Sequence, residues 1–113
     1  MQPLIDVNEG IRLCAGSRTL YLRMLARFKS DPTMARLEAA LLRCDAQEGF
    51  LQAHTLKGLA AQLALPALAA QAASLCDALR AQSPGCVQKA GTTLHALMRT
   101  YAQTLSAIAS LDP

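Results

Sequence analysis

The sequence DAQEGFLQAHTLKGLAAQLALP, residues 45–66, predicts one long helix in the middle of the chain. Asp45 and Glu48 have the spacing of a capping box, in which two side chains bond to backbone groups at a helix N-terminus. Pro66 disfavours helical geometry at the residue before it and therefore marks the end of this helix. Gly58 interrupts an alanine-rich stretch, although Gly in a helix interior is about 1 kcal/mol less favourable than Ala. We therefore expect another molecule to approach the helix closely at Gly58.

His54 is the candidate reactive residue of this helix. Successive residues of an α-helix advance by about 100° around its axis, so Leu56 and Leu63 fall nearly opposite His54 and face the expected core. Lys57 and Gly58 fall on the same side as His54. An exposed imidazole is mostly neutral at cytoplasmic pH and has a nucleophilic nitrogen. A single histidine on a helix is more often an ordinary surface residue, but the Lys57 and Gly58 spacing favours a functional one.

A mixed patch of side chains is expected around His54. Phe50 and Leu51 would add apolar contact area, and exposed apolar residues beside a polar group indicate a docking surface. Alternatively, Phe50 and Leu51 belong to the core beneath the N-terminal helices. The predicted partner-binding residues are Phe50, Leu51, Gly58, Ala61 and Gln62.

The whole chain, residues 1–113, predicts a single all-α domain. Hydrophobic residues make up 52% of the sequence and aromatic residues 4%, so the core must consist mainly of Leu and Ala, which favour helix over strand. The predicted helices run from the Asp6 cap to residue 13, then over residues 18–29, 32–43 (with Asp31 as N-cap), 46–64, 66–81 and 86–109, with a turn at Ser83-Pro84-Gly85.

Short connections between the later helices make neighbours antiparallel, and four such helices close into a bundle. We predict an antiparallel four-helix bundle with one or two short additional N-terminal helices. The predicted core stripes are Leu20, Met24 and Phe28; Leu37, Leu41 and Cys44; Leu68, Ala72, Leu75 and Leu79; and Val87, Leu94, Leu97, Met98, Tyr101, Leu105 and Ile108.

Composition argues against several classes of protein. The net charge of +3 comes from scattered basic residues, whereas nucleic-acid binders usually have a basic patch or stripe. No apolar run reaches the length of a membrane span, and no signal peptide is recognisable. The four cysteines contain no C-x-x-C pair, so a zinc site is not expected and reduced thiols in the cytoplasm are the simplest interpretation.

The sequence also lacks the parts of a self-sufficient enzyme. It has no Gly-rich loop followed by Lys and Ser or Thr for a nucleotide, and no paired carboxylates at helical spacing beside His54. We therefore do not expect it to phosphorylate itself from ATP. His95, which no Lys-Gly pair follows, is interpreted as structural or surface.

The stretch Ala53-His54-Thr55-Leu56-Lys57-Gly58, with Ala60 and Leu63 after it, resembles the signature of histidine-containing phosphotransfer (HPt) domains of multistep phosphorelays. Residues 5–10 and 20–25 are similar to the first segment of that family, so the resemblance covers most of the chain. It implies a four-helix bundle in which His54 takes a phosphoryl group from an aspartate of one receiver domain and passes it to an aspartate of another receiver domain.

The residues around His54, the composition and the resemblance together indicate how the transfer would be supported. Lys57 would offset the negative charge of the phosphoryl group during transfer. The partners would be response-regulator receiver domains and a hybrid sensor kinase, and the receiver would carry the Mg²⁺. The domain itself would need no cofactor, nucleic acid or membrane contact and would be a monomer.

The sequence departs from the family pattern at four positions. Leu59 stands where a small residue is common, Ala64 where Gly is frequent, and Gly49 where an apolar side chain is usual. Cys76 aligns with a Glu or Gln that helps to orient the imidazole in many members. Gln62 or Gln71 could replace that residue, and the sequence does not decide between them.

A non-catalytic docking or adaptor module that binds a receiver or kinase is the alternative function. In that case His54→Gln would leave function intact, whereas Phe50→Ala or Leu51→Ala would abolish partner binding. An enzyme with its own small-molecule substrate is a more distant third possibility.

Overall fold

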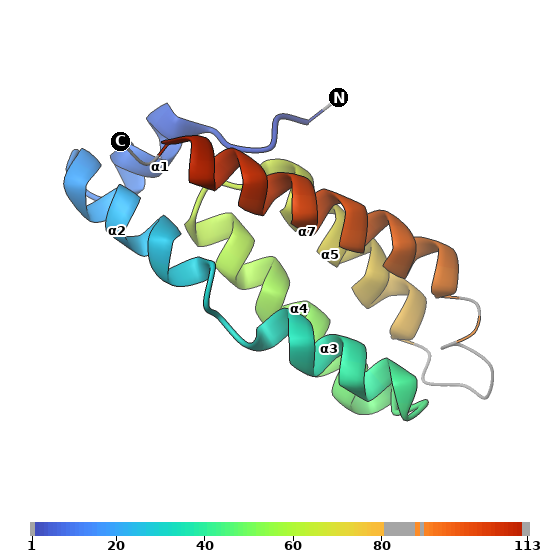
Figure 1. Cartoon of the computed structure of the whole chain (residues 1–113). Coiled ribbons are helices and arrows are strands. Elements are labelled where there is room, and N and C mark those ends of the chain that lie inside the picture. The colour runs from blue at the N-terminus through green and yellow to red at the C-terminus, as the bar shows by residue number, and fades with distance from the viewer. Residues whose placement is uncertain (1, 81–87, 89, 112–113) are drawn as a thin grey trace.

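Helices form nearly all the regular structure of residues 2–80, 88 and 90–111, which are the residues that our computed structural model describes. Within them there is no strand, which confirms the all-α prediction. The protein is a rod with principal extents of 45 × 22 × 21 Å (Figure 1). The helices are α1 (Val7–Leu13), α2 (Arg18–Phe28), α3 (Thr33–Leu42), α4 (Ala46–Gln62), α5 (Pro66–Leu79) and α7 (Gly91–Leu111).

The predicted four-helix bundle consists of α3, α4, α5 and α7. Helix α4 packs most extensively against α5 and α3, and α5 packs against α7. Helices α2 and α3 follow one another along one side of the rod, and the short α1 lies against α2 at one end (Figure 1). The helix that carries His54 is therefore held on two sides by the bundle. No helix among the described residues is long and apolar enough to cross a membrane.

Several helices begin where the sequence predicts. Asp6, Ser17 and Asp45 each accept a hydrogen bond from a backbone N–H three residues later, at 3.1, 3.1 and 3.0 Å respectively, which satisfies a free donor of the first turn. The capping box at α4 is only half formed, because the Glu48 carboxylate accepts a hydrogen bond from the Gln52 amide at 2.8 Å.

The start of α3 was predicted one residue too early. Pro32 is the N-cap and Thr33 is the first helical residue. The Asp31 carboxylate still stabilises this end, because it accepts a hydrogen bond from the Thr33 N–H at 2.8 Å.

The predicted core stripe of α2 was partly wrong. Leu20 is 43% exposed, whereas Tyr21 and Leu25 are buried. Helix α2 contacts α1 and α7, so its buried face includes Tyr21, Leu25 and Phe28. Cys44 was also assigned wrongly to the core. It is exposed beyond the end of α3, with a left-handed φ of 58°.

The stripe predicted for α5 is confirmed, since Leu68, Ala72, Leu75 and Leu79 are all buried. Helix α7 ends at Leu111, two residues later than predicted. Of its predicted core residues, Leu97 and Ile108 are buried, whereas Met98 is 40% exposed. The predicted turn at residues 83–85 and the predicted core residue Val87 lie outside the described part of the chain.

Candidate functional site

His54 lies on the exposed face of α4, as the helical periodicity predicts. Lys57 and Gly58 are exposed with it, whereas the opposite side of the helix is buried. The buried residues on that side include Ala53, Leu56 and Ala60. Burial of this apolar side fixes the rotation of α4 about its axis, so the imidazole and the ammonium group emerge on the solvent side.

The ring of Phe50 lies next to the ring of His54. The two ring centroids are 6.1 Å apart and the ring planes differ by 9°, an offset parallel arrangement that aromatic pairs favour. Phe50 precedes His54 by four residues, so both side chains occupy one side of the helix. No hydrogen bond to the imidazole is present among the described residues, and its aromatic neighbour is the ring of Phe50.

Lys57 brings a positive charge near Cys76 of α5. Burial raises the pKa of the Cys76 thiol on α5, and the nearby Lys57 ammonium partly opposes that shift. Lys57 makes no ion pair within residues 2–80, 88 and 90–111. Its ammonium group is therefore available to an anion brought to His54.

Gly58 leaves open surface beside His54. A Cβ atom added at Gly58 would meet no other atom within 4 Å. The glycine is therefore not needed for packing between helices, which removes that interpretation of its presence. Because Gly58 has no side chain, no atoms project from α4 at this position beside the imidazole.

The other predicted patch residues also reach the surface. Leu51 is 51% exposed, and Ala61 and Gln62 are exposed. Phe50 is half-buried and packs at the edge of the core. The alternative that both apolar residues lie in the core is therefore wrong for Leu51 and only half true for Phe50.

A comparison with protein families places this arrangement in a known context. The family model described as "Hpt domain" matches residues 23–108, about three quarters of the chain. The chain belongs to the Hpt domain family. Searches among curated proteins and among solved structures found no match. Hpt domains take part in phosphotransfer in phosphorelays and work with receiver domains and kinases.

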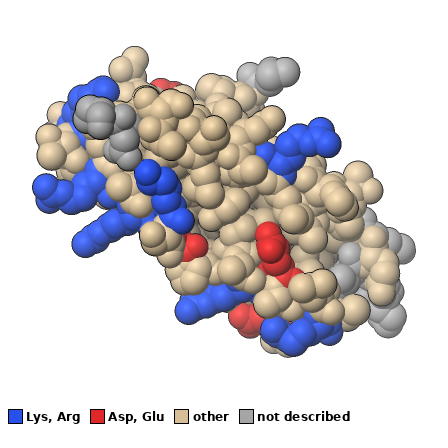
Figure 2. All heavy atoms as spheres, viewed as in Figure 1, with Lys and Arg blue, Asp and Glu red and all other residues tan. Residues whose placement is uncertain are grey.

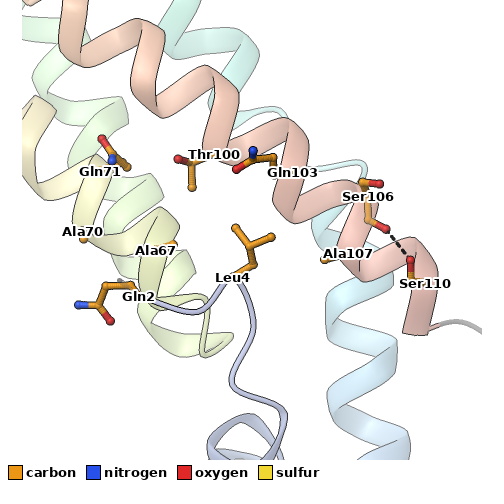
Figure 3. A pocket seen from close by; sticks show the side chains of 10 residues that line it. All are labelled: Gln2, Leu4, Ala67, Ala70, Gln71, Thr100, Gln103, Ser106, Ala107 and Ser110. Atoms are coloured by element: carbon orange, nitrogen blue, oxygen red, sulfur yellow. Dashed lines mark hydrogen bonds between the residues drawn. The ribbon is translucent and has the colours of Figure 1, made fainter.

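In this Hpt domain, neither glutamine considered from the sequence forms a hydrogen bond with the imidazole among the described residues. Gln71 lines a groove between the N-terminal segment, α5 and α7 (Figure 3), and this groove includes no residue of α4. Gln62 lines a hollow between α4 and α2. Cys76 is buried. The ring contact of Phe50 was not predicted, although its spacing of four residues from His54 was the signal that could have revealed it.

Within the described part of the chain, no group of three or more His, Cys, Asp or Glu side chains is arranged to bind a metal ion. His95 is exposed on α7, away from the helix that carries His54.

Proposed function

We propose that His54 accepts a phosphoryl group from an aspartyl phosphate of one receiver domain and donates it to an aspartate of another. The observation that carries this proposal is an exposed imidazole without a hydrogen bond among the described residues, with the ammonium group of Lys57 and the open backbone of Gly58 on the same face. Because Gly58 has no side chain, none stands at that position between a partner's active site and the imidazole.

The transfer to His54 exchanges one bond to phosphorus for another. The lone pair of one ring nitrogen forms a P–N bond while the P–O bond of the aspartyl phosphate breaks, and the aspartate leaves as a carboxylate. The proton on the other ring nitrogen can then pass to water. Donation to the second receiver reverses these steps, with a carboxylate oxygen as the nucleophile.

Lys57 supports this exchange through its charge. The transferred group carries negative charge on its equatorial oxygens, and catalysis of phosphoryl transfer depends mainly on positioning and electrostatic stabilisation. An unpaired ammonium one helical turn from His54 can supply part of that stabilisation. The receiver would supply the Mg²⁺, and the domain would act as a phosphocarrier that depends on its partner.

In this proposal the exchange takes place in the cytoplasm, where the cysteines would remain reduced. The partners are receiver domains and a hybrid sensor kinase, and the domain would act as a monomer. Phe50, Leu51, Gly58, Ala61 and Gln62 would form the part of the partner-binding surface closest to His54.

Phosphoryl transfer from a labelled receiver tests the proposal directly. Incubation with a panel of phosphorylated receiver domains should give an acid-labile, base-stable adduct, and His54→Gln should abolish it. His95→Gln is the matched control, since this second exposed histidine lies on α7, and it should retain the adduct. Absence of transfer from every receiver, or labelling that persists in His54→Gln, would contradict the proposal.

The same variant separates the phosphocarrier from a docking module. The exposed Leu51 beside His54 is compatible with partner binding in both cases. A docking module would function unchanged with His54→Gln, whereas a phosphocarrier would still bind its receiver but would no longer exchange the phosphoryl group.

A further inference from the structure

A hollow lies between α2 and α4 and adjoins the predicted patch at Gln62. Its lining includes the apolar residues Met24, Phe28 and Leu59 and the polar residues Arg27, Asp31 and Gln62. The hollow thus combines apolar and polar side chains, as protein interfaces commonly do.

The exposed surface of α4 connects this hollow to His54. Gln62 follows His54 by eight residues, which corresponds to about 12 Å along a helix. The exposed residues between them include Gly58 and Ala61, whose side chains are absent or a single methyl group. A typical protein interface covers about 800 Å² on each partner, a disc of about 16 Å radius. A partner centred on His54 therefore reaches the hollow.

Helix α2, which forms one side of the hollow, is basic, and its Arg27 lines the hollow. Helix α2 contains Arg18, Arg23 and Arg27 and no acidic residue, and none of these arginines forms an ion pair within the described residues. Arg23 and Arg27 are four residues apart and share one side of the helix. Lys and Arg side chains crowd the end of the rod formed by α1 and α2 (Figure 2).

Asp31 is the acidic residue that lines the hollow, and its carboxylate accepts a hydrogen bond from the Thr33 backbone N–H at 2.8 Å at the start of α3. No ion pair joins Asp31 to Arg27 among the described residues. The guanidinium of Arg27 therefore remains available to a carboxylate from outside the chain.

We propose that the α2–α4 hollow, with Arg23 and Arg27, is a second contact site for the receiver that exchanges phosphoryl groups with His54. The inference rests on the function proposed above. A receiver's active-site face is acidic, because it carries the phosphoacceptor aspartate and the oxygen ligands that Mg²⁺ prefers. The arginines attract that face and speed its association, and an apolar side chain of the receiver enters the hollow.

Charge reversal at one arginine, with a matched reversal elsewhere, tests this second contact. Arg27→Glu and Arg99→Glu change the net charge equally, and Arg99 is an exposed residue of α7 outside the hollow. With the receiver that exchanges fastest, Arg27→Glu should lower the second-order rate constant about tenfold at low salt. This loss should shrink as salt screens the charges. Arg99→Glu should change the rate less than twofold, and Arg27→Lys should restore most of it.

A small-molecule donor shows whether His54 itself is intact. Labelling of His54 by phosphoramidate needs no receiver and should proceed equally in the unaltered protein and all three variants. Equal rates of receiver exchange for Arg27→Glu and Arg99→Glu would overturn the second contact site while leaving the phosphocarrier function standing. Absence of exchange with every receiver, even for the unaltered protein, would contradict both the second contact site and the phosphocarrier function.

Discussion

At the residue scale, the immediate surroundings of His54 are set by Phe50. A parallel aromatic neighbour restricts the rotation of the imidazole without using either ring nitrogen, and such pairs contribute about 0.5–1.5 kcal/mol. Both nitrogens of His54 then remain available for the proposed transfer, in which one would form the bond to phosphorus and the other would carry a proton. This differs from orientation by a hydrogen-bonding Glu or Gln, for which the aligned residue here is the buried Cys76.

We expect Phe50→Leu to slow phosphoramidate labelling of His54 about three- to tenfold, because the lost ring contact is worth about that factor in rate. Phe50→Tyr should restore the rate, since it keeps the aromatic face. The ring-current shifts of the His54 resonances in NMR spectra should disappear in Phe50→Leu and persist in Phe50→Tyr.

Leu51→Ala is the control for this effect. It should weaken receiver binding, because Leu51 offers exposed apolar area, without changing labelling by phosphoramidate. If Phe50→Leu labelled as fast as the unaltered protein, Phe50 would not position the imidazole.

At the element scale, α4 carries Gly58 on its exposed face and lacks a glycine at its end. Gly58 is helical and has open space around it. Ala64, just past the helix, has a left-handed φ of 56°, and the Leu65 N–H donates to the Ala60 carbonyl at 2.9 Å in the manner of a Schellman cap. A left-handed residue with a Cβ costs about 1–2 kcal/mol, which accounts physically for a preference for Gly at this position.

The substitutions Gly58→Ala and Ala64→Gly should separate effects on stability from effects on phosphoryl exchange. Gly58→Ala should raise the free energy of unfolding by about 1 kcal/mol through helix propensity. Ala64→Gly should raise it by about 0.5–1 kcal/mol after the greater entropy of Gly in the unfolded chain is counted. Urea unfolding measures both changes.

Only Gly58→Ala should slow phosphoryl exchange with a receiver, because its methyl group stands beside His54. Ala64→Gly should exchange at the unaltered rate despite its similar gain in stability. Equal exchange rates for the two variants would show that the receiver does not need the open backbone at Gly58.

At the scale of the whole molecule, Tyr21 joins the N-terminal helices to the bundle. Its ring is buried, and its hydroxyl donates a hydrogen bond to the Leu63 carbonyl at the end of α4, at 2.7 Å. On α1, Gly10 packs so closely against this ring that a Cβ atom would overlap it. One side chain thus connects α1, α2 and the helix that carries His54.

This contact predicts a loss of stability in alkali. Burial, with smaller contributions from Asp6 and Cys14, raises the pKa of Tyr21 from its ordinary value of 10.0 to about 12. The folded protein therefore favours the neutral phenol more than the unfolded chain does. The resulting stabilisation is fully present below the unfolded pKa of about 10 and is lost as pH rises through the folded value near 12.

Urea unfolding between neutral pH and pH of about 12 measures this loss, and ultraviolet absorbance follows tyrosinate formation. Tyr21→Phe should be less stable at neutral pH, because it lacks the hydrogen bond to Leu63, and should lose less stability in alkali. Tyr101, whose pKa burial also raises, should account for the remaining dependence. An unchanged alkaline loss in Tyr21→Phe would contradict the assignment.

Those features of the fold and of the site that depend on residues close together in the sequence were predictable. The caps at Ser17 and Asp45 depend on a hydrogen bond to a backbone group three residues later. The shared exposure of His54, Lys57 and Gly58 depends only on the helical period and on which side of α4 is apolar. The sequence alone therefore determined the all-α fold, most helix starts and the face that carries the imidazole.

The tertiary structure decided which side of each helix is buried against a neighbour. It also decided which surface features, such as the hollow between α2 and α4, arise where two helices pack. Helix α2 buries Tyr21 and exposes Leu20 because its orientation follows from packing against α1 and α7. The hollow that places Arg27 beside Leu59 and Gln62 joins residues far apart in the chain. Such contacts depend on the relative placement of packed surfaces, which the periodicity of a single segment does not contain.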